Sequence, residues 1–248
     1  MKQYAETCHK LMQGLGYEQY AAQGGDWGSS IGKLLGVLYP QSLRALHLNL
    51  IMATPPPPSN PIGFVRFLTS HLLNRYTPRE STGLEKAQRF QGEGNGYFAI
   101  QKQRPGTIGV ALADSPVGLL TWIYDKLVIW TDSYPWTDDE ICEWVSIYWF
   151  SHAGPAASVN IYHEAFKGDW VSSASLYTPR TKVGFSYFPQ EMFRTPSLWN
   201  QQIGHVVFEK EHEKGGHFAA WEQPQALAED LRTMFRQGGE AYSAVIKK

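Results

Sequence analysis

Residues 20–32 contain the pattern that most restricts how this chain can fold, Tyr-Ala-Ala-Gln-Gly-Gly-Asp-Trp-Gly-Ser-Ser-Ile-Gly. The segment 20–23 is predicted to be a short strand, and the segment 29–39 is predicted to be a helix with apolar residues along one face. Between them, Gly24 and Gly28 flank Asp26, with one residue on each side of it. This small-x-nucleophile-x-small spacing is typical of a sharp strand-to-helix turn whose central residue has strained backbone angles and whose small neighbours let strand and helix approach.

The chemistry of such a turn depends on the residue at its centre. The turn would lift the Asp26 carboxylate above the sheet and next to the positive end of the following helix, which favours its ionised form. Lipases and esterases carry serine at this position, whereas an aspartate implies attack on a carbon atom and an ester to the enzyme. The alternative is a plain strand-to-helix turn with Asp26 as a polar cap. A phosphate-binding loop is not favoured, because a Gly-Lys-Ser/Thr ending is absent and a carboxylate would repel phosphate.

Length and composition favour an ordinary globular protein. The 248 residues suffice for one large domain or two small ones. A formal net charge of -1 provides no basic surface for nucleic acid and no polybasic membrane patch. Cys8 and Cys142 are the only cysteines, which excludes a disulfide framework and a thiolate metal site. Neither a signal-like apolar run nor a stretch of about 18 apolar residues occurs, so we expect a soluble, cytoplasmic protein without nucleic-acid partners.

The first part of the chain predicts a parallel α/β unit. Residues 3–14 are predicted to be helical, and residues 43–53 are predicted to be a buried parallel strand. Strand, helix and strand within about 35 residues form a βαβ unit with a right-handed crossover. A proline-rich stretch at 54–61 then predicts an extended linker.

Helical patterns follow the linker from Gly63 to about Trp170, at 65–73, 109–112, 119–130 and 138–150. Strand patterns resume with 183–188 and 204–208, and a helix is predicted at 225–235. The fold class is therefore α/β, a parallel sheet of four predicted strands interrupted by a helical insertion. The expected domains are 1–54 and 176–248 as the two parts of the sheet core, and 55–175 as a helical cap.

Two residues after Asp26 complete a candidate catalytic set. Glu191 follows the strand 183–188, and His217 follows the strand 204–208, at the carboxyl ends where sites in open parallel sheets lie. Nucleophile, acid and histidine in this order is the chain order of the α/β-hydrolase triad. His217 would take a proton from the water that attacks the ester at Asp26. Glu191 would hold the histidine tautomer and stabilise the imidazolium.

Simpler roles remain open for these residues. The chain has 8 histidines, although the Gly-Gly before His217 and the Phe-Ala-Ala after it indicate a tight turn into a helix. An acid that follows a strand is often only a helix cap, and three further acids compete with Glu191: Glu209, Glu211 and Glu213. In the pair His212-Glu213, the histidine lies five residues before His217 rather than four, and two glycines intervene, so a zinc-binding helix is not favoured and we expect no metal.

Four segments resemble epoxide hydrolases of the microsomal type, a group that includes soluble fungal members. They are Gly-Gly-Asp-Trp-Gly-Ser at 24–29, Asp-Ser-Pro-Val-Gly-Leu at 114–119, Gly-Phe-Ser-Tyr-Phe-Pro-Gln-Glu at 184–191 and Gly-Gly-His-Phe-Ala-Ala-Trp-Glu at 215–222. The resemblance runs from about Lys10 to Phe235. It implies an α/β-hydrolase fold with a helical cap, a cofactor-free reaction on a small lipophilic epoxide and water, and a vicinal diol as product.

The resemblance also implies roles for two cap tyrosines that grip and protonate the epoxide oxygen. Tyr97, in Asn-Gly-Tyr-Phe-Ala-Ile-Gln, and Tyr162, in Asn-Ile-Tyr-His-Glu, are the matching positions. A phenol with a pKa of about 10 suits the protonation of an opening alkoxide. Without the resemblance, two of 13 tyrosines would be read as ordinary packing. The backbone N–H of Trp27 would serve as an oxyanion donor during ester hydrolysis.

The sequence also departs from this family. Family members begin with a long segment and four further strands, and their His-Gly-x-Pro loop supplies another oxyanion donor; this chain starts at the helix before the elbow strand and contains no such tetrapeptide. Strand 20–23 would then be a sheet edge. The expectations are a truncated form with impaired activity, or a form that pairs this edge with another chain, such as a homodimer. A haloalkane dehalogenase-like enzyme, which shares an Asp-Trp elbow, and a non-catalytic remnant or interaction module are the other open functions.

Overall fold

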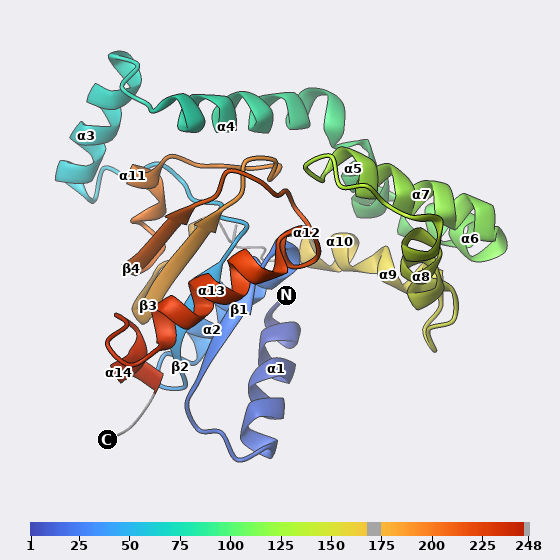
Figure 1. The fold of residues 1–248 in the computed structure, drawn as a ribbon, viewed down its shortest axis with the longest axis horizontal. Coiled ribbons are helices and arrows are strands. Elements are labelled where there is room, and N and C mark those ends of the chain that lie inside the picture. The colour runs from blue at the N-terminus through green and yellow to red at the C-terminus, as the bar shows by residue number, and fades with distance from the viewer. Residues whose placement is uncertain (168–174, 246–248) are drawn as a thin grey trace. The chain divides into compact units, whose positions relative to one another are not determined.

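The computed structural model describes residues 1–167 and 175–245. The chain forms two compact units (Figure 1). The sheet unit comprises Met1–Ala87 and Val171–Lys248, and the helical unit comprises Gln88–Trp170. The predicted end of the helical insertion, near residue 170, lies outside the described residues.

A parallel four-stranded sheet organises the sheet unit, which confirms the predicted fold class. Its strands are adjacent in chain order, β1 (Tyr20–Gly24), β2 (Leu43–Leu48), β3 (Thr178–Tyr187) and β4 (Gly204–Glu211). β2 pairs directly with β3, with Leu46 opposite Val183. In the sequence, the helical unit thus lies between two strands that are neighbours in the sheet. β1 pairs with β2 alone among the described strands, so it lies at a sheet edge as predicted.

Alternation of side chains along the central strands gives the sheet two covered faces. Leu46 and Val183 point into a core that contains Leu34 of α2 (Asp26–Leu38). Ala45 points to the opposite face, where it packs with Met234 of α13 (Pro224–Phe235). Figure 1 shows α13 crossing that second face of the strands. The crossover β1-α2-β2 is therefore a βαβ unit with α2 buried, and α1 (Lys2–Gly14) packs against α2.

Several element boundaries differ from the sequence-based prediction: β3 begins at Thr178 rather than at residue 183, and two further differences lie beside the elbow. α2 begins at Asp26 rather than at residue 29, because its first turn consists of residues without apolar periodicity and the pattern becomes visible only later. β2 ends at Leu48 rather than at residue 53. The chain leaves the ladder where the Asn49 N–H donates to the Gly24 carbonyl oxygen at 3.3 Å, although Leu50 and Ile51 stay buried.

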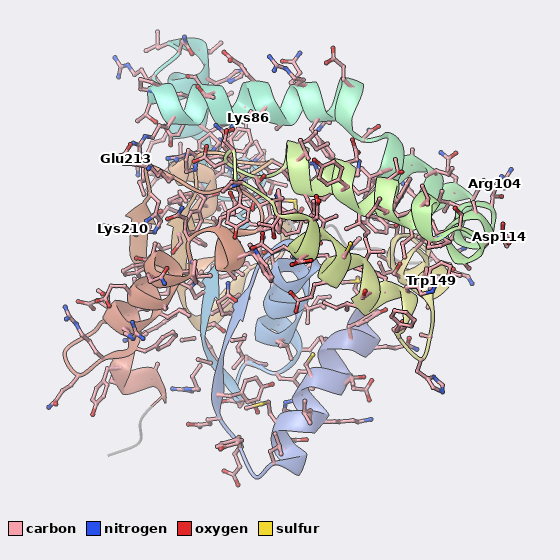
Figure 2. All side chains as sticks on the ribbon, turned by 45° about the vertical axis from the view of Figure 1, so that its right-hand side comes forward. Lys86, Arg104, Asp114, Trp149, Lys210 and Glu213 are labelled. Carbon is pink, nitrogen blue, oxygen red and sulfur yellow. The ribbon has the colours of Figure 1, made fainter. Side chains whose placement is uncertain are left out.

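The helices α3 (Pro61–Leu72) and α4 (Pro78–Arg89) follow the proline-rich linker, and the sheet unit extends through Ala87. The expected cap, 55–175, thus begins well before the compact helical unit, which starts at Gln88. Contacts explain why α4 belongs with the sheet. A Cβ on Gly83 would lie 2.6 Å from the Cβ of Arg194. Lys86, labelled in Figure 2, donates to the Pro189 carbonyl oxygen at 2.7 Å, in the loop after β3.

Short helices complete the sheet unit and lie in the loops after the strands. They are α11 (Ser197–Asn200), α12 (Ala219–Glu222) and α14 (Tyr242–Val245). The sequence pattern did not predict them, because four-residue helices carry no periodicity.

The helical unit is built of short helices around a small apolar cluster of Leu112, Leu119, Val145 and Val159. Arg104 precedes α6 and Asp114 ends it, and Figure 2 labels both side chains. Prolines and N-caps set several starts: Ser115 accepts from the Gly118 N–H before α7, and Thr137 forms a capping box with Glu140 before α8. The elements are η1 (Phe90–Gly94), α5 (Gly96–Gln103), α6 (Pro105–Asp114), α7 (Pro116–Ile129), α8 (Asp138–Trp149), α9 (Pro155–Ser158) and α10 (Asn160–Ala165).

Within the described ranges, no single helix combines the length and hydropathy needed to span a membrane. The helices α6 and α7 meet that criterion only when taken together, and the chain bends by 115° at the break between them.

Candidate active site

The strand-to-helix turn at Asp26 has the geometry predicted from its spacing. Asp26 has a φ of 44°, in the left-handed region that a non-glycine residue enters at a cost of about 1–3 kcal/mol. A Cβ on Gly24 would lie 2.5 Å from the carbonyl carbon and oxygen of Gly28, so only glycine fits there. A Cβ on Gly28 would meet nothing within 4 Å. The expectation that both neighbours must be small therefore holds for Gly24 and is wrong for Gly28.

Hydrogen bonds to the loop after β2 hold this turn in place. The buried Ser29 hydroxyl donates to the Leu50 carbonyl oxygen at 2.7 Å. The Gln23 amide donates to the Asn49 side-chain oxygen at 2.7 Å. Because both contacts come from residues within three positions of Asp26, the strained turn is fixed on its strand side and on its helix side.

The two carboxylate oxygens of Asp26 have different partners. Oδ1 accepts the backbone N–H of Trp27 at 2.5 Å, and Oδ2 lies 2.9 Å from Nε2 of His217. The Asp26 side chain is 43% exposed, whereas that of His217 is 4% exposed. Asp26 also begins α2, whose positive end stabilises a carboxylate. The arrangement presents an accessible carboxylate beside a buried imidazole.

Glu191 holds the opposite edge of the same imidazole. Its Oε1 lies 2.7 Å from Nδ1 of His217 and also accepts the Met192 N–H at 2.8 Å. The Glu191 side chain is 3% exposed. With the Nδ1 proton directed at Glu191, the remaining nitrogen faces Asp26. Three residues from distant parts of the sequence thus form one contact chain, Glu191–His217–Asp26.

The charge of His217 follows from its contacts with the two carboxylates. Burial lowers the pKa of the His217 imidazole. The negative charges of Glu191 and Asp26 and their hydrogen bonds to the ring outweigh burial and raise the pKa to about 10. His217 is therefore an imidazolium at neutral pH. Loss of either negative charge would lower this pKa.

Two loops carry the acid and the histidine, and they are joined to each other. The Gln190 N–H donates to the Gly215 carbonyl oxygen at 3.0 Å. Gly215 has a φ of 108°, and a Cβ there would lie 2.7 Å from the Phe188 ring, so both its conformation and its space require glycine. The Gly216 N–H donates to Glu222 at 3.0 Å. The Gly-Gly pair before His217 is thus explained by backbone geometry.

The competing acids are engaged elsewhere. Glu209 accepts the Tyr187 hydroxyl at 2.7 Å, and Arg79 pairs with both Glu211 and Glu213. His212 lies 2.6 Å from Asp230 rather than beside His217. Across residues 1–167 and 175–245, no group of three or more histidine, cysteine or acidic side chains is arranged to hold a metal ion.

The two tyrosines singled out from the sequence contact each other within the helical unit. Tyr97 comes from α5 and Tyr162 from α10, and their rings meet edge to face with centroids 5.8 Å apart. Trp130 lies at 5.0 Å from the Tyr97 ring. Phe98 lies at 5.5 Å from the Tyr162 ring. Aromatic packing thus sets the orientation of both phenols.

Known epoxide hydrolases are similar to this chain over almost its whole length. A protein of Stigmatella aurantiaca (strain DW4/3-1), which its name assigns to the epoxide hydrolases, is 40% identical over 243 residues, covering 96% of this chain and 51% of that protein. The structure of Aspergillus niger epoxide hydrolase matches with a TM-score of 0.75 and 34% identity, over 92% of this chain and 55% of that chain. Juvenile hormone epoxide hydrolase from the silkworm Bombyx mori matches with a TM-score of 0.76, 27% identity and coverage of 92% and 56%.

This chain is similar to epoxide hydrolases. Its fold is that of its α/β-hydrolase neighbours. The chain spans about half the length of the curated relatives it matches. No family model matches the sequence.

The sequence interpretation overlooked two residues close to the candidate epoxide hydrolase groups. Lys86 of α4 donates to the Gln190 side chain at 2.6 Å, next to Glu191. Lys126 of α7 places its ammonium group 4.8 Å from the centre of the Tyr97 ring. The sequence around Lys86 gives no sign of this contact. For Lys126 there is a local sign, because Trp122, Lys126 and Trp130 follow each other at four-residue spacing, which places all three on one helix face.

Proposed function

We propose that this chain is an epoxide hydrolase that opens an epoxide to a vicinal diol through an ester at Asp26. The observation that carries the proposal is the contact chain of Glu191, His217 and Asp26, which ends in an accessible carboxylate at a strained turn. A carboxylate in this position attacks a carbon atom and forms an alkyl ester. The names of the relatives support the same reaction.

In the first step, an Asp26 oxygen attacks one epoxide carbon, and the bond from that carbon to the epoxide oxygen breaks. The freed oxygen takes a proton from the phenol of Tyr97 or Tyr162, and the phenolate recovers its proton from water. The product is a hydroxyalkyl ester of Asp26. The Asp26 carboxylate is accessible for the attack, and His217 beside it is an imidazolium at neutral pH.

Ester formation prepares the second step. Once Asp26 is an ester, its negative charge is gone and the charge-assisted contact with His217 is lost, so the pKa of His217 falls. The imidazolium gives its proton to the hydroxide that remained when the phenolate took a proton from water, and it becomes the base that the hydrolysis needs. Glu191 keeps the Nδ1 side paired throughout. His217 therefore becomes a base only after Asp26 has formed the ester.

In the second step, His217 Nε2 takes a proton from water, and the resulting hydroxide adds to the ester carbonyl carbon. The negative charge develops on the carbonyl oxygen. Oδ1 is the oxygen that accepts the Trp27 N–H in the free protein, and this donor is already in place for the oxyanion. The carbon–oxygen bond to the alkyl group's oxygen then breaks, that oxygen takes the proton from His217, and the diol leaves.

Lipophilic and aryl epoxides are the proposed substrates. Aromatic rings surround the two phenols of the helical unit, with Trp130 against Tyr97 and Phe98 against Tyr162. Such rings offer apolar surface, and their edge-to-face geometry accepts a further ring.

The test uses styrene oxide and intact-mass spectrometry on the purified 248-residue chain. We expect a covalent adduct that Asp26→Ala abolishes, with diol release. His217→Gln should form the adduct and retain it, because the attack survives and the base is missing. Glu213→Gln, an exposed acid outside the contact chain, is the matched control.

The outcomes separate the alternatives. A stable adduct without diol in the unsubstituted chain would support the first step and reject the second for this half-length chain. Absence of an adduct on folded protein would reject the proposal and favour a non-catalytic role. Halide release from a chloroalkane without reaction on styrene oxide would favour the dehalogenase alternative.

A further inference from the structure

A partly buried cation lies among three aromatic rings of the helical unit. The Lys126 ammonium is 4.8 Å from the centre of the Tyr97 ring, 5.4 Å from that of Trp130 and 5.9 Å from that of Trp122. The Lys126 side chain is 16% exposed, against 53% for its neighbour Asp125. A partly desolvated ammonium over ring faces is held more strongly than an exposed one.

Local sequence builds this arrangement. Lys126 lies in the last turn of α7, where the negative end of the helix favours a cation. Trp122 and Trp130 lie four residues before and four residues after it, so they flank the ammonium along one face of α7. Tyr97 comes from a different helix, α5, and its ring meets Trp130 edge to face. The cation is thus anchored by its own helix and directed at the phenol ring of another.

Asp125 and Tyr97 are charged or titratable groups in contact with Lys126. Asp125 forms an ion pair with it from the same helix, on the exposed side. Tyr97 of α5 faces it, and Tyr162 of α10 contacts the Tyr97 ring. Because Asp125 is the more exposed partner, water screens its charge more than that of the ammonium. The Lys126 ammonium therefore acts on the Tyr97 ring as a nearby positive charge.

We propose that Lys126 is a positioning residue that orients Tyr97 and stabilises its phenolate form, so that Tyr97 gives its proton to the opening epoxide oxygen. This inference rests on the proposed function and goes beyond it, because it assigns an electrostatic role to a residue that does not touch the reacting atoms. A phenol that has lost its proton becomes an anion, and a cation close to the ring favours that anion. Lys126 thus lowers the barrier of the first step and leaves the ester hydrolysis unaffected.

The first test needs no turnover. Tyrosine labelled with carbon-13 at Cζ is followed by NMR during an alkaline titration, and Tyr97→Phe identifies the Tyr97 signal. We expect Lys126→Met to move the Tyr97 titration upward by about one pH unit, a tenfold change in the proton equilibrium. Lys126→Arg, which keeps the cation, should restore the original titration.

Lys102 provides a matched control in the same unit. Its ammonium lies 4.5 Å from the centre of the Phe166 ring, a cation over a ring that has no proton to give. Lys102→Met should leave the Tyr97 titration in place. An equal shift of the Tyr97 titration in Lys126→Met and Lys102→Met would overturn the proposal. Absence of a shift in folded Lys126→Met would also overturn it.

The second test measures adduct formation with styrene oxide. Lys126→Met should slow formation of the Asp26 adduct about tenfold, in proportion to the shifted proton equilibrium, with an unchanged rate of adduct breakdown. A slowed breakdown with unchanged formation would contradict the role of Lys126. If the Tyr97 titration shifts and no variant, including the unsubstituted chain, forms an adduct, then the electrostatic link stands and the epoxide hydrolase function is rejected.

Discussion

The sheet unit and the helical unit hold their candidate groups by different physical means. In the sheet unit, Asp26, His217 and Glu191 are fixed by hydrogen bonds of 2.7–2.9 Å and by a backbone in an uncommon conformation. In the helical unit, Tyr97 and Tyr162 are oriented by edge-to-face ring contacts with centroids 5.0–5.8 Å apart. One set is specified by directional polar contacts and the other by the packing of large apolar surfaces.

This difference matches what each set does in the proposed reaction. A nucleophile and a base need defined protonation states before substrate arrives, and buried charges with short hydrogen bonds provide them. Phenols that meet a variable substrate tolerate softer positioning, since each ring contact contributes only about 0.5–1.5 kcal/mol. Substitutions in the sheet unit should therefore produce large, charge-dependent effects, and those in the helical unit should produce small, graded ones.

The largest expected effect is on the pH dependence of stability. Because folding raises the pKa of His217 from its unfolded value of about 6.5 to about 10, its contribution is fully present below about pH 6.5 and is lost as the pH rises towards 10. The slope for one proton is about 1.4 kcal/mol per pH unit in this window. His217→Gln should flatten the slope measured by urea unfolding at a series of pH values. An unchanged slope would contradict the raised pKa.

The next effect compares the two glycines of the elbow. Gly24→Ala should lower the free energy of unfolding by about 3 kcal/mol, because its Cβ would overlap the Gly28 backbone. Gly28→Ala, two residues on the other side of Asp26, should change it by no more than about 1 kcal/mol, in the stabilising direction for a helical position. Chemical unfolding of both variants measures the pair. Equal losses of unfolding free energy in the two variants would show that the elbow does not depend on the close contact between Gly24 and the Gly28 backbone.

Removal of the Asp26 charge tests the coupling within the contact chain. Asp26→Asn should lower the pKa of His217 by about one unit or more, because one of its two anionic partners becomes neutral. NMR titration of the His217 imidazole measures the shift. The control is Glu213→Asn, which removes a charge from the same unit without contact to His217. A shift of the same size in the control would mean that distant charges set the pKa.

In the helical unit, we expect a smaller loss from one ring. Phe98→Leu removes the edge-to-face contacts with Tyr162 at 5.5 Å and Phe166 at 5.2 Å while it keeps an apolar side chain. The free energy of unfolding should fall by about 1 kcal/mol, with the pKa of His217 unchanged. A change in the His217 titration would contradict the expectation that substitutions in the helical unit leave the charges of the sheet unit unaffected.

The smallest effect concerns the exposed support of the acid loop. Lys86→Met removes the contacts to the Pro189 carbonyl and the Gln190 side chain and should cost about 0.5–1 kcal/mol. Hydrogen exchange of the Gln190 amide should accelerate a few-fold, since local opening becomes easier. The exposed Lys210 on β4 serves as control when replaced by methionine. Equal exchange in both variants would contradict a role of α4 in holding the loop.

Much of the sheet unit could be predicted from the sequence, because its signals are local. The elbow spacing, the apolar strands and the order of Asp26, Glu191 and His217 are read from neighbouring residues. The helices between β2 and β3 were predicted less well. α4, α5, α9 and α10 have polar, aromatic or short sequences without clear periodicity, and the membership of α4 depends on contacts with Arg194 and Pro189, more than 100 residues away.

The sequence by itself determined that residues 20–32 form a sharp strand-to-helix turn with a carboxylate at its centre, because glycine conformations and apolar spacing act over a few residues. Only the tertiary structure decided which acid meets His217. Glu191, Glu209, Glu211 and Glu213 look alike in sequence, and the joining of the Gln190 and Gly215 loops brings Glu191 alone of these four into contact with Nδ1 of His217. The same holds for Lys126 and Tyr97, which are 29 positions apart in sequence and meet through the packing of two helices. Pairings of this kind depend on the register of strands and the faces of helices, which no local pattern encodes.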